Sequence, residues 1–348
     1  MPTRHGFRRF LLGLLLGSSI PGHPPAVAQG CAPVRFAGSV PGTEGDIYLR
    51  RHTWQVSLTY RQLSSNRLIQ GHDDMGPSSV VRTKALFSSV TYGVSDRLAV
   101  TLSLPFSHGS HDTMYPDGQR HTNRATGLGD VSISAAYWLF NANALRPGGN
   151  LAVGFGLKLP TGANDVSGTW WNADGSTIAW PVHQSIELGD GGWGFSLRVQ
   201  GFQPVRSRLY LYGGGSYMFN PRRTTEVVRT PGSPQRWAVP DTWDATAGLV
   251  ATLWPVQGLS ARLGVAFDGT RKRDLLGGTD SLEHRLPATS GYLMPGVTLT
   301  RGAHTLTLSM GTRIYKRFLP SVWDDANGKK GGGGLARYVF QGGYAVRF

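Results

Sequence analysis

The chain of 348 residues has a single cysteine, Cys31, and no long run of apolar residues. One cysteine excludes an intramolecular disulfide framework, so the fold must be stabilised in another way. A membrane-spanning helix needs roughly 20 consecutive apolar residues, and no segment of the sequence comes close to that length. The composition therefore excludes helical membrane spans but leaves a membrane β-barrel open, because each strand of a barrel shows only half its residues to lipid.

Helical periodicity is also missing after the first 28 residues, and apolar residues recur instead at every second position. The segment WQVSLTYR (54–61) places Trp, Val, Leu and Tyr on one face and polar residues on the other. RLAVTLSLPF (97–106), LAVGFGLKL (151–159) and the C-terminal YVFQGGYAVRF (338–348) repeat the scheme. A period of two is the signature of β-strands, whose successive side chains point to opposite faces.

The alternation predicts twelve strands, and the segments between them differ regularly in length. The strands are expected at 53–63, 82–92, 97–107, 129–140, 150–160, 193–203, 207–219, 242–253, 258–268, 290–300, 303–316 and 336–348. Short turns and long, polar, glycine-rich loops alternate without exception along the chain. Outer-membrane barrels have this arrangement, with short periplasmic turns and long external loops. We therefore predict an all-β, transmembrane, antiparallel up-and-down β-barrel of about 12 strands; a secreted soluble β-sandwich is the alternative.

The N-terminus is typical of an exported protein. Three arginines precede the apolar stretch FLLGLLLG, and AVA at 26–28 is a small-residue cleavage site. We expect residues 1–28 to be a cleaved signal peptide, 29–52 a periplasmic N-terminal segment, and 53–348 the barrel. Lipid attachment at Cys31 is an alternative, although AQGC lacks the usual upstream leucine. The expected location is the Gram-negative outer membrane.

Three segments go beyond general barrel character: TYGVSDRLAVTLSLPF, GLGDVSISAAYWLF and VHQSIELGDGGWGF. They resemble recurring blocks of the outer-membrane family described as meta-pathway phenol-degradation transporters, and the match runs in block order from about Gln55 to the C-terminus. The resemblance implies passage of small, often aromatic, compounds across the outer membrane. The terminal Phe348 likewise resembles the signal that the outer-membrane assembly machinery recognises. The family supplies no catalytic residues to carry over.

The formal charge of +14 is spread over the whole length, which does not favour nucleic acid as a partner. On the predicted strands the basic side chains occupy the face opposite to lipid, because Arg or Lys at the bilayer midplane costs about 2–4 kcal/mol. The candidate pore-lining residues are Arg61, Lys158, Arg198, Arg208, Arg262, Arg313 and Arg337. They favour an anion-preferring lumen. Alternatively, they pair with loop carboxylates, such as Asp74, Glu187 and Asp190, and fill a narrow interior.

Two loops carry further candidate residues. Trp170, Trp171 and Trp180 lie in a long loop and could stack an aromatic solute at the entrance or fold into the pore as a constriction. Trp193 suits the aromatic girdle at the membrane interface. His108, His111, Asp112 and His121 form a weak candidate for a metal site; we expect no metal and no cofactor.

The sequence as a whole predicts an outer-membrane channel for passive passage of small solutes that are aromatic or anionic. The expected partners are the small solute, outer-membrane lipid and lipopolysaccharide, and the assembly machinery that would bind the strand ending at Phe348. A closed structural or interaction barrel is the alternative. A lipid hydrolase is a further one, but adjacent Ser107 and His108 would point to opposite faces of a strand, so no enzyme is expected.

Overall fold

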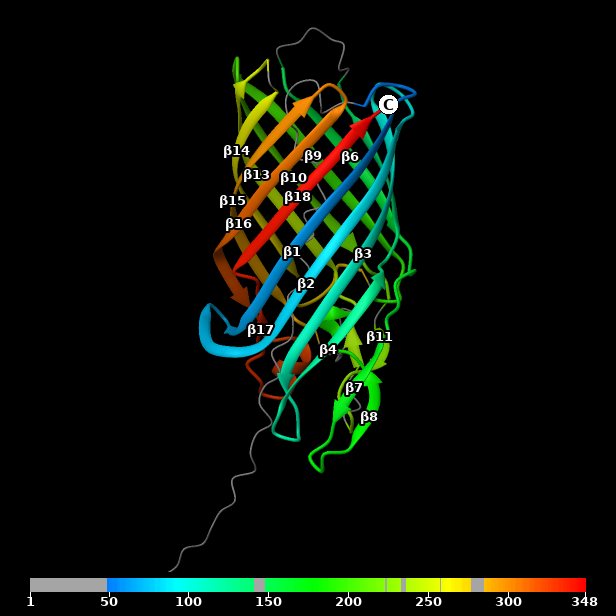
Figure 1. The fold of residues 1–348 in the computed structure, drawn as a ribbon, viewed down its shortest axis with the longest axis vertical. Helices are drawn as coiled ribbons and strands as arrows, with labels where there is room; N and C mark the ends of the chain where they lie inside the picture. Colours follow the sequence, from blue (N-terminus) through cyan, green and yellow to red (C-terminus); the bar gives the residue numbers. More distant parts are fainter. Residues whose placement is uncertain (1–48, 141–147, 223, 233–235, 257, 277–284) are drawn as a thin grey trace, which may run out of the picture.

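A computed structural model describes residues 49–140, 148–222, 224–232, 236–256, 258–276 and 285–348. The predicted signal peptide and Cys31 lie outside these ranges. Within them, twelve antiparallel strands form the wall of a closed barrel, in the order β1, β18, β16, β15, β14, β13, β10, β9, β6, β5, β3 and β2, with β2 pairing back onto β1. Figure 1 shows the strands tilted around a common axis. The prediction of a twelve-stranded all-β barrel is confirmed.

The strands of the wall are longer on average than expected from the sequence. They are β1 (Trp54–Gln70), β2 (Asp73–Gly93), β3 (Leu98–Met114), β5 (Ser132–Trp138), β6 (Asn150–Lys158), β9 (Gly194–Arg206), β10 (Leu209–Phe219), β13 (Thr242–Trp254), β14 (Leu259–Thr270), β15 (Ala288–Arg301), β16 (His304–Phe318) and β18 (Tyr338–Arg347). The remaining elements extend the wall or lie in loops: β4 (Arg120–Leu128), β7 (Ser167–Trp171), β8 (Thr177–Pro181), η1 (Gln184–Ile186), β11 (Thr224–Val228), β12 (Arg236–Ala238), α1 (Val322–Ala326) and β17 (Gly333–Gly334).

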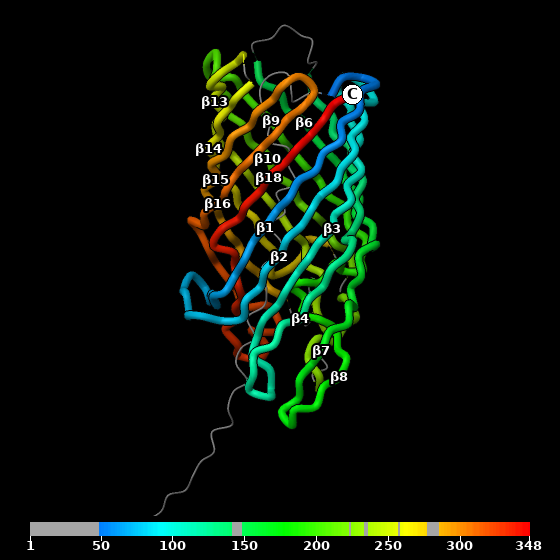
Figure 2. The backbone as a smooth tube through the Cα atoms, in the orientation of Figure 1, coloured from blue at the N-terminus to red at the C-terminus, as the bar shows by residue number. Residues whose placement is uncertain are grey.

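The two ends of the chain close the barrel. β1 and β18 pair from Gln55 opposite Arg347 to Ser64 opposite Tyr338. Beyond that ladder, the backbone N–H of Phe348 donates to the carbonyl of Trp54 at 2.9 Å, and the N–H of Trp54 donates in return. Closure leaves no strand edge, as hydrocarbon requires. The C-terminus lies at the short-turn end of the barrel, as the smooth trace in Figure 2 also shows.

A band of apolar side chains covers the outer surface and is bordered by aromatic rings. Leu58, Leu102, Phe155, Leu197 and Leu263 are each more than a third exposed on this outer face. At the short-turn end the border is formed by Trp54, Tyr92, Tyr137, Trp254 and Tyr344; at the long-loop end it is formed by Tyr60, Phe106, Trp193, Tyr217, Trp243, Tyr315 and Phe340. Two aromatic girdles around an apolar band are the surface of an outer-membrane barrel. Trp193 is 58% exposed within the second girdle, where the sequence placed it.

Two of the predicted long loops are instead strand. The segment after residue 63 continues β1 into a hairpin with β2, and the segment after residue 107 continues β3 into a hairpin with β4. In these extensions the pattern inverts: Ile69, Val81 and Ala125 are buried on the inner side, while Arg124 is exposed outside. Because apolar residues face inward in these extensions, the strands could not be recognised by an apolar outer face. It also marks where the wall leaves the bilayer.

In the part of the chain that the structure describes, no helix is long and apolar enough to cross a membrane.

The apolar band predicts a position-dependent cost for charge. Leu263→Arg, in the outer face of β14, is expected to lower the free energy of unfolding by about 2–4 kcal/mol. The matched control is Val256→Arg, in the turn that joins β13 to β14, where the side chain is 95% exposed and a change within about 0.5 kcal/mol is expected. Urea unfolding of the barrel refolded into bilayers measures both. Equal costs at the two positions would show that Leu263 does not face lipid.

Candidate functional site

The inner face of the wall carries a row of polar and charged side chains that runs across five adjacent strands. Cross-strand pairing places Arg198 beside Ser216, Ser216 beside Asp244, and Asp244 beside Asp268. The Asp268 carboxylate accepts a hydrogen bond of 2.5 Å from the hydroxyl of Ser290, its neighbour on β15, and Ser216 donates to Asp244. Such a row is tolerated only where it faces away from lipid. It forms the charged belt of the lumen.

Arg61 completes this belt from the opposite side. It lies on β1, which three strands separate from Asp268 on β14, yet the two side chains interact electrostatically. The guanidinium also lies over the Phe87 ring, 4.9 Å from its centroid. Arg61 is only 7% exposed, so its charge is held inside the barrel. A cation buried beside an aromatic face and a carboxylate is stabilised by both.

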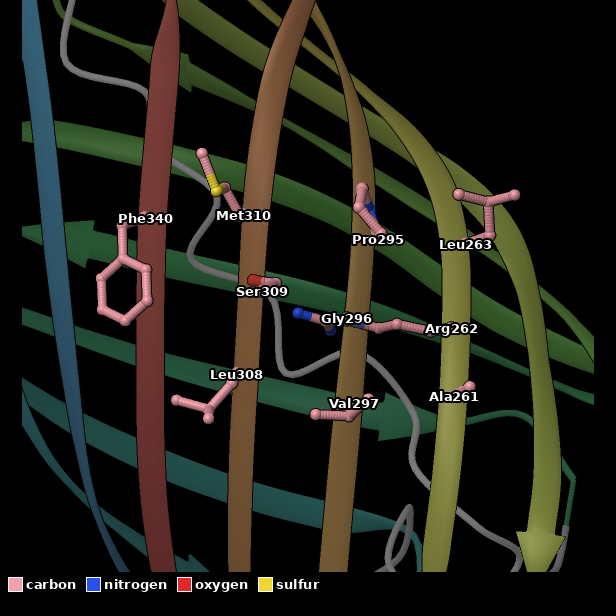
Figure 3. Close-up of a pocket in the computed structure, with 10 residues that line it drawn as sticks. All are labelled: Ala261, Arg262, Leu263, Pro295, Gly296, Val297, Leu308, Ser309, Met310 and Phe340. Carbon is pink, nitrogen blue, oxygen red and sulfur yellow. The ribbon is translucent and has the colours of Figure 1, made fainter.

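Arg262 lies closer to the short-turn end than the charged belt does, and its side chain crosses β15 at Gly296. Its Nε is 2.6 Å from where a Cβ on Gly296 would stand, so glycine at this position is required for the side chain to cross β15. Figure 3 shows the guanidinium in the space between β15 and β16, near Ser309. Among the described residues, neither the buried Nε of Arg262 nor the buried hydroxyl of Ser309 has a hydrogen-bond partner. Both atoms are enclosed by the wall, but Arg262 as a whole is only partly buried, so its terminal nitrogens are the part that a solute can meet.

The wall itself is interrupted next to Arg262. The β15–β16 ladder pairs Leu293 with Thr312 and Gly296 with Ser309, but the positions between them are not paired. Pro295 lies in this gap, and proline has no N–H to donate to a ladder. A hollow of about 510 Å³ opens there on the outer face, lined mainly by apolar residues that include Leu263, Val297, Leu308 and Met310 (Figure 3).

Aromatic side chains line the inner face near the short turns. Tyr210 and Tyr212 are buried in a cluster with Val250, against which Phe202 packs. The Trp138 and Phe202 rings are 6.1 Å apart at 71°. The Tyr212 hydroxyl reaches across to β14, 2.2 Å from where a Cβ on Gly264 would stand. Trp138, Tyr210 and Tyr212 are buried in this packing, and Phe202 is the ring that stays partly exposed.

Lys158 also points inward, but loop carboxylates occupy it. It forms an ion pair with Asp190, and its Nζ is 3.6 Å from Asp130 Oδ2. Lys158 therefore anchors the loop between β6 and β9 to the wall, as the alternative of loop pairing predicted for the lumen bases.

Of the three other predicted pore-lining residues, one lies on the inner face but is bound to a loop, and two lie off the inner face. Arg313 is on the inner side of β16, where its guanidinium donates at 2.6 Å to the carbonyl of Leu335 and thereby holds the loop before β18. Arg208 is exposed in the turn between β9 and β10, at the rim rather than on the wall, because the predicted strand began two residues early. Arg337 precedes β18, is exposed, and lies over the outward Tyr338 ring at 5.4 Å, so it does not line the lumen.

The loop between β6 and β9 (159–193) folds against the inner wall at the long-loop end. Val182 and Ile186 are buried together with Val81 of β2 and Ala125 of β4. A Cβ on Gly109 would stand 2.7 Å from Ile186 Cβ, so this part of β3 has no room for a larger residue. The His111 and His183 rings are stacked, with centroids 4.3 Å apart. The loop is thus packed on the inner wall of the barrel at its long-loop end.

A buried ion pair ties this loop to the next one. Arg229, between β11 and β12, pairs with Glu187, and each side chain is 2% exposed. The same guanidinium donates at 2.8 Å to the carbonyls of Val182 and Asn164. Burial raises the pKa of Glu187 to about 7, and the Arg229 charge opposes that rise. The pair is the strongest candidate for a latch that holds the loop in the mouth.

The predicted loop tryptophans lie in two places. Trp170 and Trp171 are in β7, where both rings pack on Tyr115, at 5.4 and 4.8 Å, and Trp171 stacks on His121 at 4.1 Å. Trp180 is in β8, which pairs with β7. Trp170 and Trp171 therefore form one aromatic cluster with Tyr115 and His121 at the outer tip of the barrel.

The predicted loop histidines do not converge. His108 faces outward and donates to or accepts from Thr126, His111 stacks on His183, and His121 pairs with Asp117 at 2.6 Å. No group of three or more metal-ligating side chains is present in the described ranges.

Asp244 and the inner aromatic residues are absent from the candidates that sequence reasoning produced. Asp244 shares its strand phase with Thr246 and Gly248, so strict alternation would have placed it inside. Trp138 shares the phase of the polar residues in SISAAYW, which is the signal that could have identified it.

Comparison with solved structures identifies the fold as that of outer-membrane barrels. An outer membrane channel from Pseudomonas putida F1 aligns with a TM-score of 0.61 at 14% identity, over 87% of this chain and 98% of that chain. The translocator domain of the autotransporter NalP from Neisseria meningitidis aligns with a TM-score of 0.45 at 13% identity, over 88% and 91% of the two chains. The toluene transporter TodX from P. putida gives 0.42 at 10% identity, over 86% and 91%. No family model and no curated protein matches the chain. The resemblance to the phenol-degradation transporters thus stays a prediction beyond its barrel fold.

Proposed function

We propose that the barrel is a passive outer-membrane channel for small solutes that are aromatic or anionic. The observation that carries this proposal is Arg262, whose guanidinium lies on the inner side of the wall, is partly exposed, and has no hydrogen-bond or ion-pair partner among the described residues. A guanidinium without a partner in a confined lumen attracts a carboxylate or sulfonate, to which its terminal nitrogens would donate charge-assisted hydrogen bonds. Arg198 and Arg61 lie farther up the same lumen beside Asp244 and Asp268, whereas Arg262 forms no ion pair with a described carboxylate.

Two further features support an aromatic solute with an anionic group. The rings of Trp138, Phe202, Tyr210 and Tyr212 lie on the inner wall near the short turns, on the same side of the bilayer as Arg262. Contact with the partly exposed Phe202 ring and attraction to the guanidinium would favour the same molecule. The chain presents no nucleotide-binding motif in its sequence, so passage would follow the concentration gradient.

The folded loop at the mouth supports a closed barrel as the second candidate. Residues 159–193 lie against the inner wall and are latched by Glu187 and Arg229. In a channel this loop would set the conductance; in a closed barrel it would abolish passage.

Uptake into proteoliposomes tests the proposal. We expect benzenesulfonate, an aromatic anion that cannot cross lipid in a neutral form, to enter faster than tetramethylammonium. Arg198→Ala with Arg262→Ala is expected to reduce benzenesulfonate entry about tenfold, since a lost charge contact of about 1.4 kcal/mol is a factor of ten. The matched control, Arg206→Ala with Arg301→Ala, removes two exposed rim charges and should change little. No entry of either ion into liposomes with folded protein would favour the closed barrel.

A further inference from the structure

A cationic patch lies on the outer surface immediately beyond the apolar band. Arg82 and Lys84 on β2 and Arg124 on β4 are all exposed on the outward face. β2, β3 and β4 lie side by side in Figure 1, at the long-loop half of the barrel. We name Arg82, Lys84 and Arg124 the outer basic patch.

The ladder fixes how the three cations are arranged. Ser110 of β3 pairs with Arg82 on one side and with Arg124 on the other, while Lys84 pairs with His108 in the row below. Neighbouring strands are about 4.8 Å apart, so Arg82 and Arg124 stand about 10 Å apart across Ser110. Long side chains at that separation can converge on one phosphate.

The charges of the patch are not neutralised within the described chain. Neither a hydrogen bond nor an ion pair to a described residue involves Arg82, Lys84 or Arg124. The adjacent carboxylate, Asp112, is paired with Arg120 at 2.6 Å. Three like charges placed this close repel one another unless a counter-charge binds between them.

The position of the patch along the barrel axis indicates which anionic group would neutralise it. Directly below it, towards the bilayer, lies the outward row of Leu86, Phe106 and Leu128, which are 39%, 44% and 56% exposed. This row is the upper limit of the apolar band, so the patch stands where hydrocarbon gives way to head groups. An anion bound there would be attached to a lipid whose acyl chains cover the apolar row.

We propose that the outer basic patch binds the phosphates of a phosphorylated glycolipid of the outer leaflet, with Arg82 and Arg124 on one phosphate and Lys84 beneath them. Arginine and lysine donate charge-assisted hydrogen bonds to phosphate. The hydroxyl of Ser110 and the His108–Thr126 pair lie between the cations and can contact the sugar. The site is independent of the lumen, and it would anchor the extended β2–β4 wall at the membrane surface.

Binding of bisphosphorylated lipid A to the purified full chain in detergent, measured by native mass spectrometry, tests the proposal. We expect wild type to bind it at least about tenfold more tightly than the triple variant Arg82→Gln, Lys84→Gln and Arg124→Gln. The control triple variant, Arg51→Gln, Arg206→Gln and Arg301→Gln, removes the same charge from exposed positions at the opposite end and should bind like wild type. A conservative variant, Arg82→Lys with Arg124→Lys, should retain part of the affinity and shows that the patch tolerates substitution without unfolding.

Two further probes separate the sources of phosphate. Dephosphorylated lipid A should bind the wild type and the patch variant equally and weakly, and inorganic phosphate alone should bind far more weakly than lipid A. Equal binding of lipid A to wild type and the patch variant would overturn the proposal, and so would inorganic phosphate binding as tightly as lipid A. Neither outcome bears on solute passage, which the patch variant is expected to retain at the wild-type rate.

Discussion

At pH 8, where Glu187 is ionised, Glu187→Ala is expected to raise the mean conductance of the barrel strongly, because it leaves the Arg229 guanidinium buried without its carboxylate. Removing one partner of a buried pair costs about 3–5 kcal/mol, and a loss at the lower end shifts the docking equilibrium of the loop roughly 100-fold. The loop of residues 159–193 would then leave the inner wall. Single-channel recording shows the effect as longer or more frequent open events.

Two variants control this result. Glu226→Ala removes the carboxylate of an exposed pair with Arg236, more than half exposed on both sides, and should leave conductance unchanged. The double variant Glu187→Leu with Arg229→Met replaces the whole pair by apolar side chains and should restore part of the closure, since no charge stays buried but the carbonyls of Val182 and Asn164 lose their donor. A Glu187→Ala barrel that conducts like wild type would show that the pair does not latch the loop.

The second large effect is a pH dependence of loop docking that two groups drive in opposite directions. Burial raises the pKa of Glu187 to about 7, from 4.5. The docked loop thus holds this proton more tightly, so its contribution is fully present below about pH 4.5 and is lost as the pH rises through 7. His111 lies on the β3 extension, five residues beyond the girdle residue Phe106, and burial lowers its pKa to about 4, from 6.5. Its contribution is present above pH 6.5 and is lost as the pH falls through 4.

The two contributions oppose each other, so docking in the wild type should vary little between pH 4.5 and 6.5. Each variant should reveal the other group, with a total change of about 3 kcal/mol. In Glu187→Gln the loop should loosen as the pH falls from 6.5 to 4, and in His111→Phe it should tighten as the pH falls from 7 to 4.5. Hydrogen exchange of residues 159–193, expressed as protection factors, measures docking directly. The same pH profile in both variants would refute the assignment.

The strands inside the bilayer could be predicted because one physical rule fixes every second residue. Lipid demands an apolar side chain on the outer face, so Leu58 and Leu263 disclose their strands without further context. The β1–β4 extensions were not predicted because water lies outside them and loop residues lie inside, which buries Ile69 and Val81 and leaves Arg124 exposed. In these extensions the apolar residues of the alternating pattern face inward and the polar residues face outward, the reverse of the pattern inside the bilayer.

The candidate site was predictable in part for the same reason. Alternation correctly indicated that Arg61, Arg198 and Arg262 point inward, since each lies in the middle of a regular strand. Arg337 and Arg208 lie at strand ends, where an error of two residues moves a side chain from the wall to the rim or the outside. The Glu187–Arg229 pair joins two loops 42 residues apart, and no local pattern encodes a contact between loops.

The central claim is that the lumen conducts and that its arginines select anions. Single-channel recording of the mature barrel in planar bilayers, with a salt gradient across the membrane, tests it most directly. The account predicts a steady current whose reversal potential indicates anion preference, and a loss of that preference in Arg198→Ala with Arg262→Ala. A correctly folded barrel that remains silent, or one whose reversal potential is unchanged when both arginines are removed, would contradict it.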